Sequence, residues 1–455
     1  MTYTYDLIVI GGGPAGYLAA ERAGEAGLSV ALFEKRALGG VCLNEGCIPT
    51  KTFLNSAKIY AHALHGERYG VVASGISLDH AAVLRRKAKV VETLVGGVGF
   101  KMREKGVTVV KEAAKIGGKT GEGFLVKGGE TEAVAPKLII AAGSKPIIPP
   151  IPGVADGLDA GYVYTSREIL DIDHIPDSLV IVGGGVIGLE MADYFAVAGS
   201  KVTVIEMLDK IAGPFDAEIA RILKKNLEAK GVMFLLGTKV TEVTRGGVKA
   251  ETGGEAVTVE GDAVLMSIGR RPAPEDMGLE KINVLVENGA VVTGKHMQTN
   301  ISGVYAAGDI NGKFMLAHTA YREAEVAVNH ILGKPDEMRY DAIPSVIYTQ
   351  PEAAFVGDTE ESAAAKGLRV VVKKLPLTYS GRYVSENERG DGICKTLIDE
   401  GTGRVVGVSL IGGYASEIIL SASILTGLGV PAEQAKRVVF PHPTVGEIVR
   451  ETLFV

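Results

Sequence analysis

Two stretches of this 455-residue chain repeat one pattern of glycines and acids, and this repeat limits the possible folds more than any other feature. In each stretch an apolar segment runs into the spacing GxGxxG, a predicted helix follows, and a second apolar segment ends at a glutamate. The first copy holds Gly11, Gly13, Gly16 and Glu34, and the second holds Gly183, Gly185, Gly188 and Glu206. Such glycines let a pyrophosphate approach a helix N-terminus, and the acid accepts hydrogen bonds from ribose hydroxyls. The repeat therefore predicts two dinucleotide sites in an α/β chain.

The spacing within the two copies is the same. Gly13 and Glu34 are 21 positions apart, as are Gly185 and Glu206. An acid at the end of the second strand favours a free ribose 2′-hydroxyl over a 2′-phosphate. We therefore expect the second site to prefer NAD to NADP.

A pair of cysteines follows the first copy in the segment GGVCLNEGCIPTK, residues 39–51. Cys42 and Cys47 are two of the three cysteines in the chain. They are close enough in sequence to close a ring, and a thiolate is the reactive form of either thiol. A structural disulfide is the less favoured reading, because the chain has no disulfide framework and no export signal. A zinc site completed by His62 and His65 is disfavoured by its spacing, so no metal is predicted.

Two segments further along the chain carry candidate site residues. Asp309 follows an apolar run, where its carboxylate could bind a chain of sugar-like hydroxyls or simply belong to a turn. His442 stands between two prolines, which fix the direction of the backbone. Glu447 is close enough to orient the imidazole, so His442 is a candidate acid–base group, with a structural role as the alternative.

Composition supports an α/β protein that binds small molecules or other proteins. With 60 glycines, 6% aromatic residues and no tryptophan, the chain fits tight strand-to-helix turns. A net charge of -6 leaves no basic excess for nucleic acid or anionic lipid. The N-terminal apolar run reads as a strand at 5–10 rather than a signal peptide, and the apolar helix predicted at 418–430 is too short to span a bilayer. We expect a cytoplasmic protein with no nucleic-acid or membrane partner.

These motifs together resemble the pyridine nucleotide-disulfide oxidoreductases, most closely their dihydrolipoamide-oxidising members, over essentially the whole chain. The resemblance implies an enzyme with FAD at the first site and NAD at the second, which oxidises protein-bound dihydrolipoamide to lipoamide with NAD as acceptor. It also implies a homodimer whose active sites are shared across the interface. The implied partner is a lipoyl-bearing protein of a 2-oxoacid dehydrogenase or glycine cleavage complex.

The resemblance further implies two Rossmann-like dinucleotide-binding domains followed by a C-terminal α+β dimerisation domain. Residues 1–150 and 271–340 would form the FAD-binding domain, 151–270 the NAD-binding domain, and 341–455 the dimerisation domain. The proline-containing segments 146–153 and 267–274 look like linkers between lobes. Alternating strand patterns at 369–373 and 403–410 mark the last domain.

Individual roles are also implied by the resemblance. Cys42 would be the interchange thiol, Cys47 the thiol facing the flavin, His442 the base and Glu447 its orienting partner. Lys51 would lie by the flavin and pair with Glu190. Further cofactor contacts would come from Gly40, Ala114, Gly143, Asp309, Ala317, Val240 and Gly269.

The motifs leave several alternatives open. Reductases of glutathione-like or mycothiol-like disulfides share the cysteines but run toward the thiol, and an assembly subunit or a non-catalytic redox sensor would use the same fold differently. Glu45 is an unusual residue to find between the cysteines, because a carboxylate there should disfavour a thiolate by like-charge repulsion. Cys394 has no partner in sequence and is predicted to be a buried structural thiol.

Overall fold

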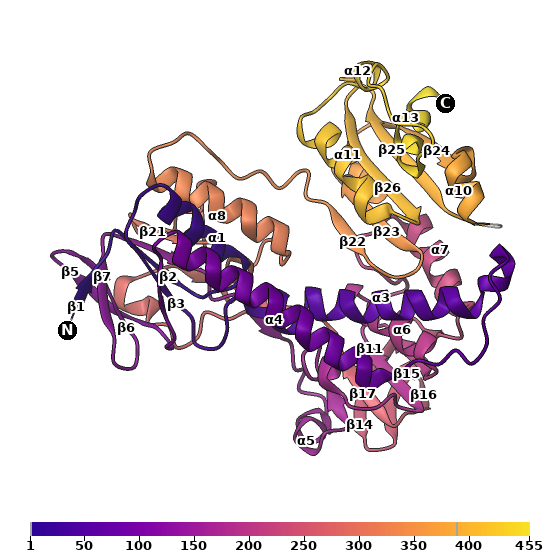
Figure 1. The fold of residues 1–455 in the computed structure, drawn as a ribbon, viewed down its shortest axis with the longest axis horizontal. Coiled ribbons are helices and arrows are strands. Elements are labelled where there is room, and N and C mark those ends of the chain that lie inside the picture. The colour runs from indigo at the N-terminus through magenta and orange to yellow at the C-terminus, as the bar shows by residue number, and fades with distance from the viewer. Residues whose placement is uncertain (1, 388–389) are drawn as a thin grey trace. The chain divides into compact units, whose positions relative to one another are not determined.

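The computed structural model of the protein describes residues 2–387 and 390–455 (Figure 1). The chain divides into two compact units. Unit 1 comprises the residues up to Thr52, Ala82–Ile147 and Gly269–Arg339, and unit 2 comprises Phe53–Ala81, Ile148–Ile268 and Tyr340–Val455. The chain leaves unit 1 after Ile147 and returns at Gly269, inside the two segments that resemble linkers.

Unit 1 is built on a five-stranded parallel sheet in the order β21-β8-β2-β3-β4. Its strands are β2 (Leu7–Ile10), β3 (Val30–Phe33), β4 (Thr108–Val110), β8 (Lys137–Ile140) and β21 (Val304–Ala306). Its central strands are almost wholly apolar and buried, as expected for a parallel sheet covered on both faces. Helices α1 (Pro14–Glu25) and α8 (Ala317–Ile331) pack against each other (Figure 1). The strand predicted from residue 5 begins only at Leu7, because the Asp6 carboxylate turns to accept hydrogen bonds from Ser29.

The remaining elements of unit 1 surround this sheet. A second sheet has the order β1-β7-β6-β5, with β1 (Thr2–Thr4), β5 (Lys115–Thr120), β6 (Gly123–Lys127) and β7 (Glu132–Ala135). Two short pairs are β9 (Ser144–Pro146) with β18 (Arg270–Pro272) and β19 (Val286–Glu287) with β20 (Ala290–Val291). Helix α2 (Gly40–Glu45) lies in unit 1, while α3 (Cys47–Leu64) and α4 (His80–Glu104) each run through both units.

Unit 2 repeats the parallel architecture. Its sheet has the order β10-β17-β11-β12-β13, made by β10 (Val163–Tyr164), β11 (Ser178–Val182), β12 (Lys201–Ile205), β13 (Met233–Leu235) and β17 (Ala263–Met266). The associated helices are α5 (Val154–Ala160), α6 (Val186–Ala198) and α7 (Ala217–Glu228). An antiparallel meander is added by β14 (Thr238–Thr244), β15 (Gly247–Thr252) and β16 (Glu255–Glu260).

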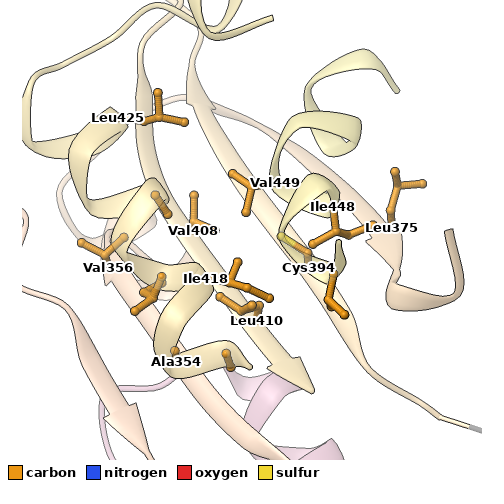
Figure 2. Close-up of a cluster of buried hydrophobic side chains, with 14 of the residues drawn as sticks. Ala354, Val356, Leu375, Cys394, Val408, Leu410, Ile418, Leu425, Ile448 and Val449 are labelled. Carbon is orange, nitrogen blue, oxygen red and sulfur yellow. The ribbon is translucent and has the colours of Figure 1, made fainter. Parts of the chain in front are cut away.

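The C-terminal part of unit 2 is an antiparallel sheet in the order β22-β23-β26-β25-β24. Its strands are β22 (Ser345–Ile347), β23 (Glu352–Gly357), β24 (Val370–Pro376), β25 (Ile393–Asp399) and β26 (Val405–Gly412). The helices are α9 (Glu360–Ala365), α10 (Gly381–Glu386), α11 (Ala415–Gly427), α12 (Ala432–Ala435) and α13 (Ile448–Glu451). Side chains of α11, α13 and the sheet meet in one buried apolar cluster, which includes Cys394 (Figure 2).

The predicted fold class is confirmed: the protein is an α/β chain with two parallel sheets of the dinucleotide-binding kind and a C-terminal α+β part. Among the described residues, none of the helices combines the length and apolar character that a bilayer span requires.

Candidate active site and cofactor sites

The turn after β2 can be made only by glycine at two positions. A Cβ at Gly16 would lie 1.7 Å from the carbonyl oxygen of Gly11, and a Cβ at Gly11 would lie 2.3 Å from that of Ala141. Gly11 also has a φ of +105°, which other residues rarely adopt. The sequence therefore brings the start of α1 against the end of β2, as a dinucleotide turn requires.

The space in front of α1 suits a dinucleotide. Gly13 caps α1, and an added Cβ there would meet only the Cα of Gly40, at 3.8 Å. The Glu34 carboxylate at the end of β3 accepts hydrogen bonds from the backbone N–H groups of Gly12 and Arg36, both at 2.7 Å. An open helix N-terminus beside a held carboxylate is the arrangement that binds a pyrophosphate and its ribose. These residues fit FAD.

The second glycine turn, in unit 2, has nearly the same backbone contacts and hydrogen bonds as the first. A Cβ at Gly188 would lie 2.2 Å from the carbonyl oxygen of Gly183, and Gly183 has a φ of +109°. The Glu206 carboxylate accepts from Gly184 N–H at 2.7 Å and from Leu208 N–H at 2.8 Å. Gly185 has open space around it. The second turn therefore fits NAD for the reason that the first fits FAD.

The two cysteines lie in unit 1, in two consecutive helices that are separated by one glycine. Cys42 is in α2, Gly46 ends that helix, and Cys47 begins α3. The hydrogen bond with Cys47 and burial raise the pKa of the Cys42 thiol, while the Lys51 charge opposes the shift. Lys51 is four residues after Cys47 on α3, hence on the same helix face. The structure therefore brings together a thiol pair and a cation, as a redox dithiol needs.

A partly buried acid, Asp309, lies in the same unit. The Ser144 hydroxyl donates to the Asp309 carboxylate at 2.5 Å, and Arg270 Nε donates to the Ser144 hydroxyl oxygen at 2.8 Å. Burial raises the pKa of Asp309, against the Ser144 hydrogen bond and the Arg270 charge. A partly buried carboxylate suits the binding of polyol hydroxyls, which can donate hydrogen bonds to it. The sequence identified Asp309 but missed Ser144 and Arg270, although Ser144 directly follows the predicted contact residue Gly143 and Arg270 lies within the predicted linker 267–274.

The histidine–glutamate pair predicted at the C-terminus forms in unit 2. His442 Nδ1 donates to the Glu447 carboxylate at 2.9 Å, which leaves Nε2 free to take a proton. The imidazole is 76% exposed in the single chain, whereas the Glu447 side chain is 14% exposed. Glu190, in α6, is buried and accepts from the N–H of Tyr348 at 3.0 Å. The Lys51–Glu190 ion pair stays a prediction.

The other predicted contact residues occupy varied positions. Gly40 and Gly143 have positive φ, and a Cβ at Gly40 would lie 2.6 Å from the Cα of Gly13. Ala317 is the first residue of α8, Ala114 packs against the unit 1 core, and the carbonyl of Gly269 accepts from Ile147 N–H. The Val240 side chain is buried in a core cluster of unit 2, so only its backbone is available to a nucleotide.

The predicted site residues are thus divided between the two units. Unit 1 brings together the first glycine turn, the cysteines, Lys51 and Asp309, and unit 2 holds the second glycine turn, Glu190 and the His442–Glu447 pair. Within residues 2–387 and 390–455, no group of three or more His, Cys, Asp or Glu side chains is arranged to hold a metal ion.

Comparison with known proteins places these features in one family. Residues 5–324 match the family model described as pyridine nucleotide-disulphide oxidoreductase, and residues 343–453 match the dimerisation domain of the same family. The chain is 38% identical to a dihydrolipoyl dehydrogenase of Mycoplasma pneumoniae over 98% of this chain and 97% of that relative. It is 39% identical to one of Trypanosoma brucei brucei over 98% and 95%.

Solved structures show the same likeness. LpdA from Mycobacterium tuberculosis matches with a TM-score of 0.91 at 26% identity, over 98% of this chain and 99% of that one. The HOCl-induced flavoprotein disulfide reductase RclA from Escherichia coli matches with a TM-score of 0.85 at 27% identity, over 99% and 100%. With both family models matched and both glycine turns and the dithiol formed, the chain belongs to the pyridine nucleotide-disulphide oxidoreductases, and FAD and NAD are its cofactors.

Proposed function

We propose that this chain is a dihydrolipoyl dehydrogenase that oxidises protein-bound dihydrolipoamide and reduces NAD. The observation that carries the proposal is the hydrogen-bonded pair of Cys42 and Cys47 beside the first glycine turn. Gly40, which begins the helix that holds Cys42, lies against Gly13 of that turn. A dithiol held beside a flavin site can exchange electrons with a dithiol substrate. The relatives named dihydrolipoyl dehydrogenase support this choice of substrate.

The exchange with substrate follows from the roles assigned to the residues. His442 Nε2 takes a proton from one substrate thiol, and the resulting thiolate attacks Cys42 of the Cys42–Cys47 disulfide. The S–S bond breaks, and Cys47 leaves as a thiolate. The second substrate thiol then attacks the mixed disulfide, which releases Cys42 as a thiol and the substrate as a cyclic disulfide. Two electrons have passed from the substrate to the dithiol.

The remaining residues bind, position and stabilise charge. FAD, when bound, supplies the two-electron transfer that carries the electrons from the dithiol to NAD. Lys51 places a positive charge near the dithiol, where it favours the thiolate. Asp309 and Glu34 would hold the sugar-like hydroxyls of FAD, and Glu206 those of the NAD ribose. Glu447 keeps the imidazole in the tautomer whose Nε2 accepts a proton.

We further propose the three domains expected from the sequence, with residues 1–150 and 271–340 binding FAD, 151–270 binding NAD, and 341–455 making the dimer. The match to the dimerisation domain supports a homodimer. The exposed His442 suits a site completed by a second subunit. The partner would be a separate lipoyl-bearing protein of a 2-oxoacid dehydrogenase or glycine cleavage complex, in the cytoplasm.

A reductase of another disulfide is the second candidate. The likeness to RclA, a flavoprotein disulfide reductase, favours it. Such an enzyme would use the same dithiol in the opposite direction, and Glu206 argues for NADH rather than NADPH as its electron donor.

Substitution of the proposed base tests the main proposal. Because a positioned general base contributes about 10²–10⁴ in rate, His442→Ala should lower dihydrolipoamide oxidation by that factor. It should leave NADH-dependent dye reduction unchanged, since the dye bypasses the dithiol. His174→Ala is the matched control, because His174 is exposed and pairs with Asp173 at 2.8 Å in the same way. Equal loss of both activities in His442→Ala would refute the role of His442.

A further inference from the structure

A carboxylate between the two cysteines is held by an arginine in an unexpected way. Glu45 is the last residue of α2, where the helix dipole disfavours a negative charge. Arg36 donates to both carboxylate oxygens, from Nη1 to Oε1 at 3.1 Å and from Nη2 to Oε2 at 2.6 Å. This two-bond geometry is the strong form of an arginine–carboxylate pair. The like-charge repulsion expected at Glu45 is therefore countered locally.

The arginine belongs to a segment that is itself anchored in the first glycine turn. The backbone N–H of Arg36 donates to Glu34 at 2.7 Å, and the same carboxylate accepts from Gly12 N–H at 2.7 Å. The residues 34–36 thus bind the glycine turn at one end and the end of α2 at the other. Through this segment, the position of Glu45 is fixed relative to the proposed FAD site.

The pair is more than an ordinary surface contact. The Glu45 side chain is 15% exposed and that of Arg36 is 48% exposed, so the carboxylate is held mostly out of solvent. Glu45 is followed by Gly46, whose φ of −150° and ψ of −110° end the helix, and then by Cys47. Only Gly46 separates the held end of α2 from Cys47, so a displacement of Glu45 moves the chain that leads into Cys47.

We propose that Arg36 and Glu45 are a positioning pair for the redox dithiol. They hold the end of α2 so that the sulfurs of Cys42 and Cys47 meet in the geometry that closes the disulfide. This role rests on the proposed function, in which these two cysteines are the redox pair. Neither residue touches substrate in this account, and each acts through the backbone between the cysteines.

The consequence concerns the equilibrium between dithiol and disulfide. Oxidised dithiothreitol takes two electrons and two protons from Cys42 and Cys47, one S–S bond forms in the protein, and the bond in the reagent breaks. If the end of α2 is held less firmly, the two sulfurs meet less often, and formation of the Cys42–Cys47 disulfide becomes less favourable. Arg36→Met and Glu45→Gln should each lower the equilibrium constant for disulfide formation by about tenfold, equivalent to about 30 mV. Because both break the same pair, the double variant should be no lower than the single ones within about twofold.

The measurement uses the FAD-loaded protein equilibrated anaerobically in dithiothreitol redox buffers, with thiols trapped by alkylation and Cys42 and Cys47 counted by peptide mass spectrometry. Arg322→Met and Asp336→Asn are matched controls. Arg322 also binds the Asp336 carboxylate through both Nη atoms, in unit 1, with side chains 43% and 15% exposed. The controls should change the constant by less than about twofold, while thermal melting checks that every variant folds. Should a neutral variant not fold, Arg36→Lys keeps the charge but loses the two-bond geometry, and should shift the constant in the same direction.

Two results would overturn the positioning role. Single variants that shift no further than the controls would show that the pair does not act on the dithiol. Shifts in opposite directions for Arg36→Met and Glu45→Gln, cancelling in the double variant, would show that the pair acts by charge on the thiolate instead. A wild-type protein with no Cys42–Cys47 couple at all would refute the proposed function, whereas a normal wild-type couple with unshifted variants would refute only this inference.

Discussion

At the scale of the residue, Cys394 shows how burial raises the pKa of a thiol. Its side chain is fully buried in β25, within the apolar cluster drawn in Figure 2. Burial raises its pKa to about 12, against hydrogen bonds with Thr396 and Thr452. The prediction of a buried thiol is confirmed. The prediction rests on the lack of a partner cysteine in the sequence, because an unpaired cysteine is among the residue types most often buried.

The raised pKa of Cys394 predicts a loss of stability in alkali. Below pH 9 the thiol is protonated in both states, but between pH 9 and 12 only the unfolded chain releases the proton, so unfolding becomes easier as pH rises. At about pH 10.5 this effect should cost about 2 kcal/mol. Cys394→Ala should therefore lose about that much less stability than wild type between about pH 8 and pH 10.5, measured by urea unfolding. An equal loss in both proteins would contradict the assignment.

Among the site residues, the sequence located those that belong to a motif and missed those that depend on a distant contact. Cys42, Cys47 and His442 each lie in a short pattern whose spacing carries the chemistry. Ser144 and Asp309 are 165 residues apart, and no local pattern predicts that they meet. Arg36 gave no signal either, because an arginine next to a lysine reads as a solvated turn.

At the scale of the element, we expect the two glycine turns to act as separate binding elements. In each turn, the third glycine of GxGxxG lies against the carbonyl oxygen of the first glycine. An added Cβ would lie 1.7 Å from this oxygen at Gly16 and 2.2 Å from it at Gly188. Any side chain there must push the helix from its strand. Damage to one turn should therefore affect one cofactor.

Alanine substitution tests this separation. Gly188→Ala should keep FAD, seen as flavin absorbance, but weaken NADH binding about tenfold or more, equivalent to about 1.4 kcal/mol. Gly16→Ala should lose FAD. Gly97→Ala is the control, because a Cβ on this α4 residue has open space, and it should keep both cofactors. Loss of FAD from Gly188→Ala would show that the turns are not independent.

The sequence predicted the regular elements to within a few residues where hydrophobic periodicity was strong. The strand patterns at 369–373 and 403–410 correspond to β24 (Val370–Pro376) and β26 (Val405–Gly412), and the apolar helix at 418–430 corresponds to α11 (Ala415–Gly427). The small sheet β1-β7-β6-β5 had no such signal. Strand β5, with the sequence KIGGKT, lacks alternation and owes its place to antiparallel pairing with β6.

At the scale of the whole molecule, the homodimer determines which chain supplies each catalytic group. If each active site combines Cys42 of one subunit with His442 of the other, two inactive variants should rescue each other. Co-expressed Cys42→Ser and His442→Ala chains would form mixed dimers with one intact site. For random mixing, half of the dimers are mixed, so about a quarter of wild-type dihydrolipoamide oxidation should return. Activity no higher than the sum of the two separate variants would place both groups in one chain.

We expect dihydrolipoamide to reduce the Cys42–Cys47 pair, and FAD, when bound, would supply the transfer of these two electrons to NAD. The most direct test is an anaerobic titration of the FAD-loaded protein, first with dihydrolipoamide and then with NAD, followed by visible absorbance. We expect a long-wavelength band on adding dihydrolipoamide, which disappears when NAD is added while NADH absorbance grows. A flavin spectrum unchanged by dihydrolipoamide but bleached by NADH would contradict the proposed substrate, and would leave a family member that reduces a different disulfide.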